Sequence, residues 1–163
     1  MIILFAAFVV TVLCSITAQQ KNDFLKHHNQ LRQALNRGEV SGQPTPIGLK
    51  DLKWDEGLQL SAQHLANKCI MQHDSKEERA SPKWSYVGQN VYGGWNVTNT
   101  VFSWFNEHKD YNFESQKCKK VCGHYTQVVW EDTTHVGCAV KDCSNASTGY
   151  QYKNLVVCNY GPG

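Results

Sequence analysis

Near the start of the chain, apolar residues recur at the spacing that places them on one face of an α-helix. Over residues 24–35 the apolar positions, with His28 among them, recur at three- and four-residue steps, which predicts an α-helix. Asn22 or Asp23 is its expected N-cap, and Gly38 is expected to end it.

A second stretch with this spacing follows Trp54, and Asp55 is its expected N-cap. Its apolar stripe consists of Leu58, Ala62, Leu65, Ala66 and Cys69. Residues 38–50 are rich in glycine and proline, and residues 74–83 are rich in charge. Both segments are predicted to be loops, and the second is expected to be solvated.

A third helix is predicted over the segment VFSWFNEHKDY, with Thr98 or Asn99 as its cap. Trp104, Glu107 and Tyr111 lie three and four residues apart in this segment. All three side chains therefore share one face of the predicted helix.

Strand patterns stand mostly late in the chain. Residues 87–94 resemble a short strand that ends in a glycine turn, and residues 135–143 and 154–160 are rich in valine and cysteine. Helices early and strands late favour an α+β fold over alternating βαβ units.

The 163 residues are enough for one domain with a buried core, and 41% of them are hydrophobic. The net charge is +2, and basic and acidic residues are interspersed along the chain. Nucleic acid is excluded as an expected partner, because binding to phosphates needs a clustered positive surface.

The first eighteen residues carry no charged side chain, and an apolar run from Ile2 to Leu13 leads into small and polar residues. This layout predicts a secretory signal peptide over residues 1–18, cleaved after Ala18. The run is too short for a transmembrane anchor. An exported protein is the expectation, with residues 19–163 as its single domain.

Six cysteines remain after Cys14, and an even number in an exported chain predicts three disulfides. They are Cys69, Cys118, Cys122, Cys138, Cys143 and Cys158. Fifteen pairings are possible on sequence alone. Two N-glycosylation sequons, at Asn96 and Asn145, fit the same secretory route.

Seven histidines raise the question of a catalytic or metal site. Five of them have no partner at ligand spacing and are interpreted as core or surface residues: His27, His28, His64, His108 and His135. The HExxH motif of zinc peptidases and the GxSxG motif of serine hydrolases are both absent. The remaining candidates for chemistry are His73, Glu107 and His124.

The segments GHYTQVVWEDT (residues 123–133) and LVVCNYGPG (residues 155–163) resemble the two signatures of the CAP superfamily. This superfamily comprises cysteine-rich secretory proteins, antigen 5 and pathogenesis-related proteins, and it includes venom-allergen-like proteins. The similarity extends to HNQLR, LKWDEGLQLSAQHLANKC and WFNEHKDY, and so covers residues 19–163.

The resemblance implies an α-β-α three-layer sandwich with a central antiparallel sheet. It also implies three disulfide pairs by order along the chain: Cys69–Cys143, Cys118–Cys122 and Cys138–Cys158. Because Gly163 closely follows the second signature, a single-domain member without a cysteine-rich extension is expected.

Members of the superfamily share a cavity lined by two histidines and two acidic residues, and some bind zinc there. The resemblance maps these positions to His73, Gln89, Glu107 and His124. Gln89 departs from the usual glutamate, so it cannot act as a base and it withdraws one negative charge. Weak Zn²⁺ binding by the two histidines is expected, with Glu107 orienting one of them.

Three functions follow from the resemblance. The first is non-enzymatic binding of a fatty acid or sterol, for which Tyr111 and Phe113 begin an aromatic loop after the third helix. The second is a signalling or immunomodulatory protein that acts on an extracellular or host protein. A metal-dependent hydrolase comes third, because Gln89 replaces an acid and a free nucleophile is lacking.

Overall fold

The computed structural model describes residues 16–163. The helices are α1 (Ala18–Asn36), α2 (Glu56–Asn67), α3 (Thr100–Phe105), the 3-10 helix η1 (Asn106–Asp110) and α4 (Gly123–Val128). The strands are β1 (Lys53–Trp54), β2 (Gly88–Gly94), β3 (Tyr111–Asn112), β4 (Lys117–Cys118), β5 (His135–Asp142) and β6 (Asn154–Gly161). No helix in this part of the chain is long and apolar enough to cross a membrane.

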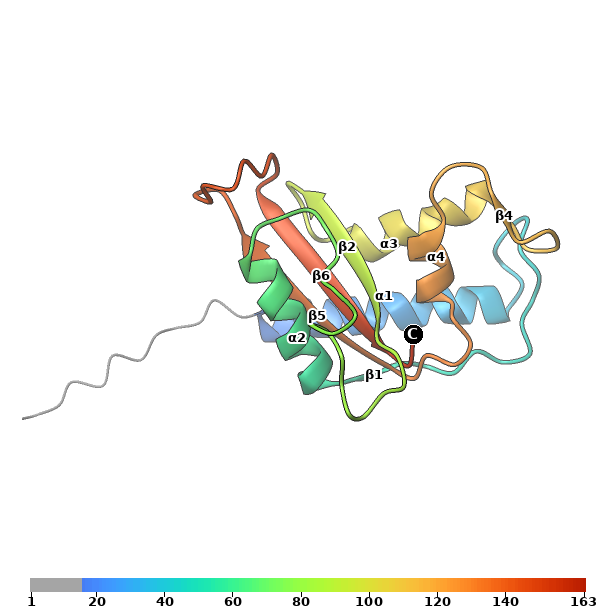
Figure 1. The fold of residues 1–163 in the computed structure, drawn as a ribbon. Coiled ribbons are helices and arrows are strands. Elements are labelled where there is room, and N and C mark those ends of the chain that lie inside the picture. The colour runs from blue at the N-terminus through green and yellow to red at the C-terminus, as the bar shows by residue number, and fades with distance from the viewer. Residues whose placement is uncertain (1–15) are drawn as a thin grey trace, which may run out of the picture.

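A central sheet lies between two helical layers, as expected (Figure 1). Its strand order is β1-β5-β6-β2, with α2 on one face and α1, α3 and α4 on the other. The pairs β2–β6 and β5–β6 are antiparallel, whereas the two-residue β1 lies parallel to β5. The expectation of an antiparallel sheet therefore holds except at this short edge strand.

A hydrophobic core lies on each face of the sheet, and strand β6 contributes to both of them. Leu155 and Val157 pack against the α2 layer, while Val156, Cys158 and Tyr160 pack on the side of α1, α3 and α4. Successive side chains of a strand point to opposite faces, so a strand buried on both sides is apolar almost throughout.

Helix α1 begins earlier than the sequence pattern predicts. Its N-cap is Thr17, whose hydroxyl accepts from the main-chain N–H of Gln20, and the Gln20 side chain accepts from the N–H of Thr17. Ile16 before it is buried in the core. The predicted caps at Asn22 and Asp23 are wrong, because this reciprocal capping box starts the helix upstream. Residues 1–15 of the predicted signal peptide lie outside the described part of the chain.

The third helix is shorter than predicted. After Phe105 the chain tightens into η1 and then leaves the helix, so Tyr111 begins strand β3. The segment 74–83 also differs from the prediction, because it is not solvated throughout. Asp74 and Arg79 are buried and form an ion pair, with Nη1 and Oδ1 3.2 Å apart.

The three disulfides pair as the family resemblance implies. Cys69–Cys143 ties the end of α2 to the end of β5, and Cys138–Cys158 crosses from β5 to β6. Cys118–Cys122 joins β4 to the residue before α4. This last disulfide thus holds the start of α4 close to the β3–β4 hairpin.

Candidate functional site

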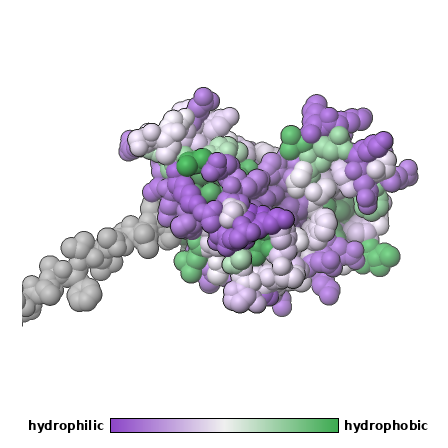
Figure 2. Space-filling view, viewed as in Figure 1, coloured by the Kyte–Doolittle hydropathy of each residue, from purple (hydrophilic) through white to green (hydrophobic). Residues whose placement is uncertain are grey.

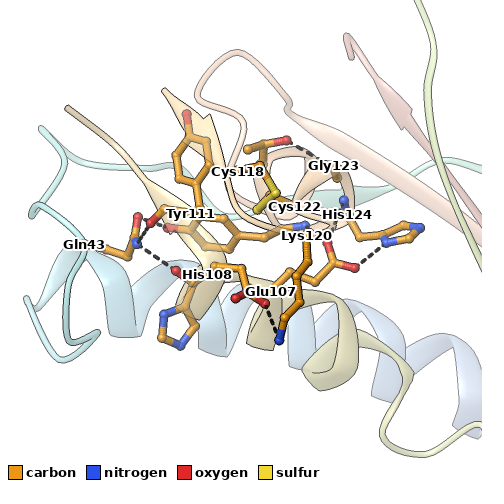
Figure 3. Close-up of a disulfide and its surroundings, with 12 residues drawn as sticks. Gln43, Glu107, His108, Tyr111, Cys118, Lys120, Cys122, Gly123 and His124 are labelled. Atoms are coloured by element: carbon orange, nitrogen blue, oxygen red, sulfur yellow. Dashed lines mark hydrogen bonds and ion pairs between the residues drawn. A yellow bond between two sulfur atoms is a disulfide. The ribbon is translucent and has the colours of Figure 1, made fainter. Parts of the chain in front are cut away.

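Glu107 of η1 holds the start of α4. Its carboxylate accepts from the main-chain N–H groups of His124 (3.1 Å) and Tyr125 (3.3 Å), and its Oε1 lies 2.6 Å from His124 Nδ1. Figure 3 shows this carboxylate beside the His124 side chain. A histidine whose Nδ1–H donates to a carboxylate carries its lone pair on Nε2, so Glu107 sets the tautomer of His124.

The imidazole of His124 also stacks on an indole. Its ring centre lies 6.0 Å from that of Trp104, with 19° between the planes. Trp104 is fully buried, while the His124 side chain is 26% exposed. His124 is therefore fixed on two sides and still reaches solvent.

His73 forms a second pair, with Gln89 of β2. His73 Nδ1 lies 2.8 Å from Gln89 Oε1, which can only accept, so Nε2 is again the free lone pair. The Gln89 amide nitrogen donates to Asp74 Oδ1 and to Asn159 Oδ1, each at 2.9 Å. Gln89 is thus locked by hydrogen bonds in both directions.

A buried chain of hydrogen bonds runs from α1 to α4. His28 Nδ1 donates to the carbonyl of Phe24 (2.7 Å), and its Nε2 accepts from the Tyr160 hydroxyl (2.8 Å). Asn90 then donates to both the Tyr160 oxygen (3.2 Å) and the carbonyl of His124 (3.1 Å). Burial lowers the pKa of His28 to about 4 and raises that of Tyr160, so both are neutral at physiological pH.

The four mapped residues therefore fall into two pairs, His73 with Gln89 and His124 with Glu107. No hydrogen bond or ion pair within residues 16–163 joins one pair to the other. Across the same residues, no three His, Cys, Asp or Glu side chains are grouped so that they could share a metal ion. A two-histidine zinc site completed by water stays a prediction.

A groove with a volume of about 530 Å³ lies on another side of α4. Tyr111 and Phe113, predicted from sequence to contact lipid, both line it. The other lining residues are Leu35, Pro44, Thr45, Pro46, Ile47, Leu49, Gln116, Tyr125, Thr126, Val129, Trp130, Glu131 and Asp132. The groove is therefore bounded by α1, the loop before β1, the β3–β4 hairpin and α4.

Tyr125 separates the groove from the histidine pair. It follows His124 directly, yet it lines the groove and donates its hydroxyl to Gln43 Oε1 at 3.0 Å. The Gln43 amide nitrogen in turn donates to the carbonyls of His108 (3.0 Å) and Tyr111 (2.9 Å), as Figure 3 shows. Burial raises the pKa of Tyr125 to about 12, so this hydroxyl stays protonated.

Sequence reasoning missed most of this groove. The loop residues Pro44, Pro46 and Ile47 form one wall, but proline and glycine in that segment indicate only a loop. Trp130 was not predicted either, because the family signature that contains it was interpreted only through His124. The apolar character of PTPI inside an otherwise polar loop was the available signal.

Both sequons lie on the surface. Asn96 and Asn145 are exposed, and Asn96 Oδ1 accepts from the main-chain N–H of Thr98 at 2.8 Å. Their occupancy by glycan stays a prediction.

The model of the cysteine-rich secretory protein family, CAP, matches residues 25–160. The chain belongs to this family. Its relatives include the centipede toxin Scoloptoxin SSD552 of Scolopendra dehaani, 37% identical over 155 residues, covering 91% of this chain and 71% of the toxin. Human GLIPR1-like protein 1 is 36% identical over 85% of this chain, which spans 56% of that longer protein.

Solved structures of CAP proteins share the fold. Venom allergen-like protein 4 of Schistosoma mansoni superposes with a TM-score of 0.80 at 28% identity, covering 91% of this chain and 90% of that one. NaASP2, whose structure was determined with Zn²⁺, gives a TM-score of 0.70 at 25% identity, over 90% of this chain and 81% of its own. The chain is thus a venom-allergen-like CAP domain.

Proposed function

We propose that this CAP domain is a secreted, non-enzymatic protein that binds a small apolar ligand, a fatty acid or a sterol, in the groove between α1 and α4. The groove is the observation that carries the proposal. Its volume of about 530 Å³ lies within the range of small-molecule sites, and its lining is mostly aliphatic and aromatic.

Exposed apolar side chains at the groove supply the driving force. Ile47 is fully exposed, and Phe113 and Trp130 are 54% and 47% exposed. In Figure 2 the viewed face is mostly hydrophilic, with several small hydrophobic patches scattered over it. A ligand that covers these side chains gains about 25 cal/mol for each Å² of apolar surface buried.

Weak zinc binding at the histidine pairs is a separate proposal. His73 and His124 each have Nδ1 held by a neighbour, which leaves Nε2 available to a cation. Among residues 16–163, Glu107 supplies the only carboxylate bonded to either imidazole. Two neutral imidazoles with water suit zinc chemically, but a site with so little negative charge holds it weakly.

Catalysis is not part of the proposal. Gln89 cannot accept a proton, and His124 is bonded to a carboxylate rather than to a nucleophile. The six cysteines between residues 69 and 158 are all in disulfides, so none of them supplies a thiolate. Secretion is proposed from these disulfides, from the predicted signal peptide and from the toxin relatives.

Native mass spectrometry of the secreted protein tests the proposal. We expect an apolar ligand to co-purify, and a delipidated sample to take up a fluorescent fatty acid or sterol with saturation. An Ile47→Ser/Phe113→Ala variant should bind at least several-fold more weakly, because both side chains are exposed and contribute to the groove rather than to the core. A Leu60→Ser/Trp95→Ala variant is the matched control, with exposed apolar residues outside the groove. Equal loss in both variants would contradict the proposal.

A further inference from the structure

The charge of the groove is all of one sign. Of its fifteen lining residues only Glu131 and Asp132 are charged, and both are acidic. Both are exposed, and neither has an ion-pair or hydrogen-bond partner for its side chain among residues 16–163. Their negative charges are therefore not neutralised by a neighbouring cation.

Arg32 is bonded to the main chain next to this rim but is buried and does not line the groove. Arg32 donates to the carbonyls of Val128 (3.1 Å) and Trp130 (2.9 Å), but its side chain is buried and is not part of the lining. Its Nε donates to the carbonyl of Lys50 at 2.9 Å. No lysine or arginine is among the residues that line the groove, so the lining itself offers no positive partner to a carboxylate head group.

The groove also offers aromatic surface next to the acidic rim. Trp130 directly precedes Glu131, and Tyr111, Phe113 and Tyr125 complete the aromatic lining. The face of an aromatic ring attracts a cation, and most strongly where the cation is partly desolvated. Aromatic rings beside carboxylates form the kind of surface that accommodates an ammonium group.

We infer that the groove selects amphiphiles with a cationic head, a long-chain amine or quaternary ammonium, over ionised fatty acids. The inference rests on the proposed function, the binding of an apolar ligand in this groove, and adds a cationic head group where that proposal named a fatty acid or a sterol. At about 5 Å in a water-like dielectric, one unit charge changes binding about four-fold. Two carboxylates should therefore separate cationic from anionic heads by at least about ten-fold at low salt.

Three probes of equal chain length isolate the head group: dodecyltrimethylammonium, dodecanol and dodecanoate, each below its micelle concentration at neutral pH. Isothermal titration calorimetry should rank the cation first, the alcohol second and the carboxylate last. High salt should narrow the gap, because these charges are exposed to solvent. The Glu131→Gln/Asp132→Asn variant should bind the cation more weakly and the carboxylate more tightly than the wild type does. Its affinity for dodecanol should stay within about two-fold of the wild-type value.

Glu77→Gln/Glu78→Gln is the control, since it removes an adjacent acidic pair that does not line the groove. It should leave the ranking unchanged. Carboxylate binding as tight as that of the cation would overturn the inference and leave the proposed function standing. Failure of all three probes to bind would overturn both.

Discussion

Arg32 in the middle of α1 donates from Nη1 to the main-chain oxygen of Trp130 at 2.9 Å. The same nitrogen reaches the carbonyl of Val128 at 3.1 Å, at the C-terminal end of α4. This buried guanidinium, to which no carboxylate of the described part of the chain is bonded, thus fixes the segment that forms one wall of the groove. The carbonyls at a helix end carry partial negative charge, which explains how this cation is tolerated in the core.

Replacing Arg32 with methionine should lower the free energy of unfolding by about 3 kcal/mol, because buried carbonyls lose their donors. Arg32→Lys should recover part of this loss, since an ammonium keeps the charge but not the planar geometry. Urea unfolding measures both variants. A loss below about 1 kcal/mol for the methionine variant would show that water replaces the guanidinium without cost.

The stability of the domain should fall in mild acid through His28. Its folded pKa of about 4 lies below the ordinary value of 6.5, so between these values the unfolded chain binds a proton that the folded chain excludes. The stabilisation is complete above pH 6.5 and is lost as the pH falls toward 4. From pH 7 to pH 5 we expect a loss of about 2 kcal/mol from this group.

Urea unfolding at a series of pH values tests this expectation in the wild type and in His28→Gln. The variant should be less stable at neutral pH but should show a flatter acid slope, because position 28 no longer titrates. His27→Gln is the control on the adjacent residue, which is only partly buried. An unchanged slope in His28→Gln would assign acid sensitivity to other groups.

The start of α1 bears on processing. Cleavage after Ala18, as predicted from sequence, would remove the Thr17 cap and the buried Ile16. Loss of the cap costs about 1 kcal/mol, and loss of a buried isoleucine costs roughly 1.5–3 kcal/mol. A chain that begins at Gln19 should therefore unfold at lower urea concentration than one that begins at Ile16. Equal midpoints for the two chains would mean that these contacts add nothing.

A glutamate at position 89 should lower the stability of the fold and raise its affinity for zinc. In Gln89→Glu the amide that donates to Asp74 and Asn159 becomes an acceptor, so each of these two oxygens loses one donor, and Asp74 keeps the one from Arg79. We expect a loss of about 1–3 kcal/mol without metal. Zinc affinity should rise, because the added charge lies beside His73. Calorimetry with zinc measures this rise, and equal affinity in both proteins would show that position 89 does not face the metal.

The sequence predicted the fold where periodicity is long. The α2 stripe with its Asp55 cap and the strands β2, β5 and β6 lie where expected, except that the helix ends at Asn67, before Cys69. The prediction failed where a few side chains determine the local structure. The Thr17 capping box moves the start of α1. The Asp74–Arg79 pair is buried in a segment whose composition indicates exposure to solvent. Charge content alone does not show that two opposite charges meet in the core.

The candidate site shows the same division. The family resemblance assigned His73, Gln89, Glu107 and His124 to one shared cavity, and the structure shows them as two hydrogen-bonded pairs. Tyr111 and Phe113, predicted to contact lipid, line the groove. The opposite wall depends on a loop of proline and glycine whose path no periodicity encodes. The segment that forms α4 was not predicted as a helix. Helical spacing therefore could not show that two adjacent residues of α4 face different surfaces of the molecule.

The apolar ligand is expected to occupy the groove and not the histidine pairs. Titration of one fluorescent apolar probe into His73→Ala/His124→Ala and into Ile47→Ser/Phe113→Ala, each checked for folding by circular dichroism, tests it most directly. We predict wild-type affinity in the histidine variant and at least several-fold weaker binding in the groove variant. Loss of binding in a folded histidine variant, with wild-type affinity in the groove variant, would contradict the claim.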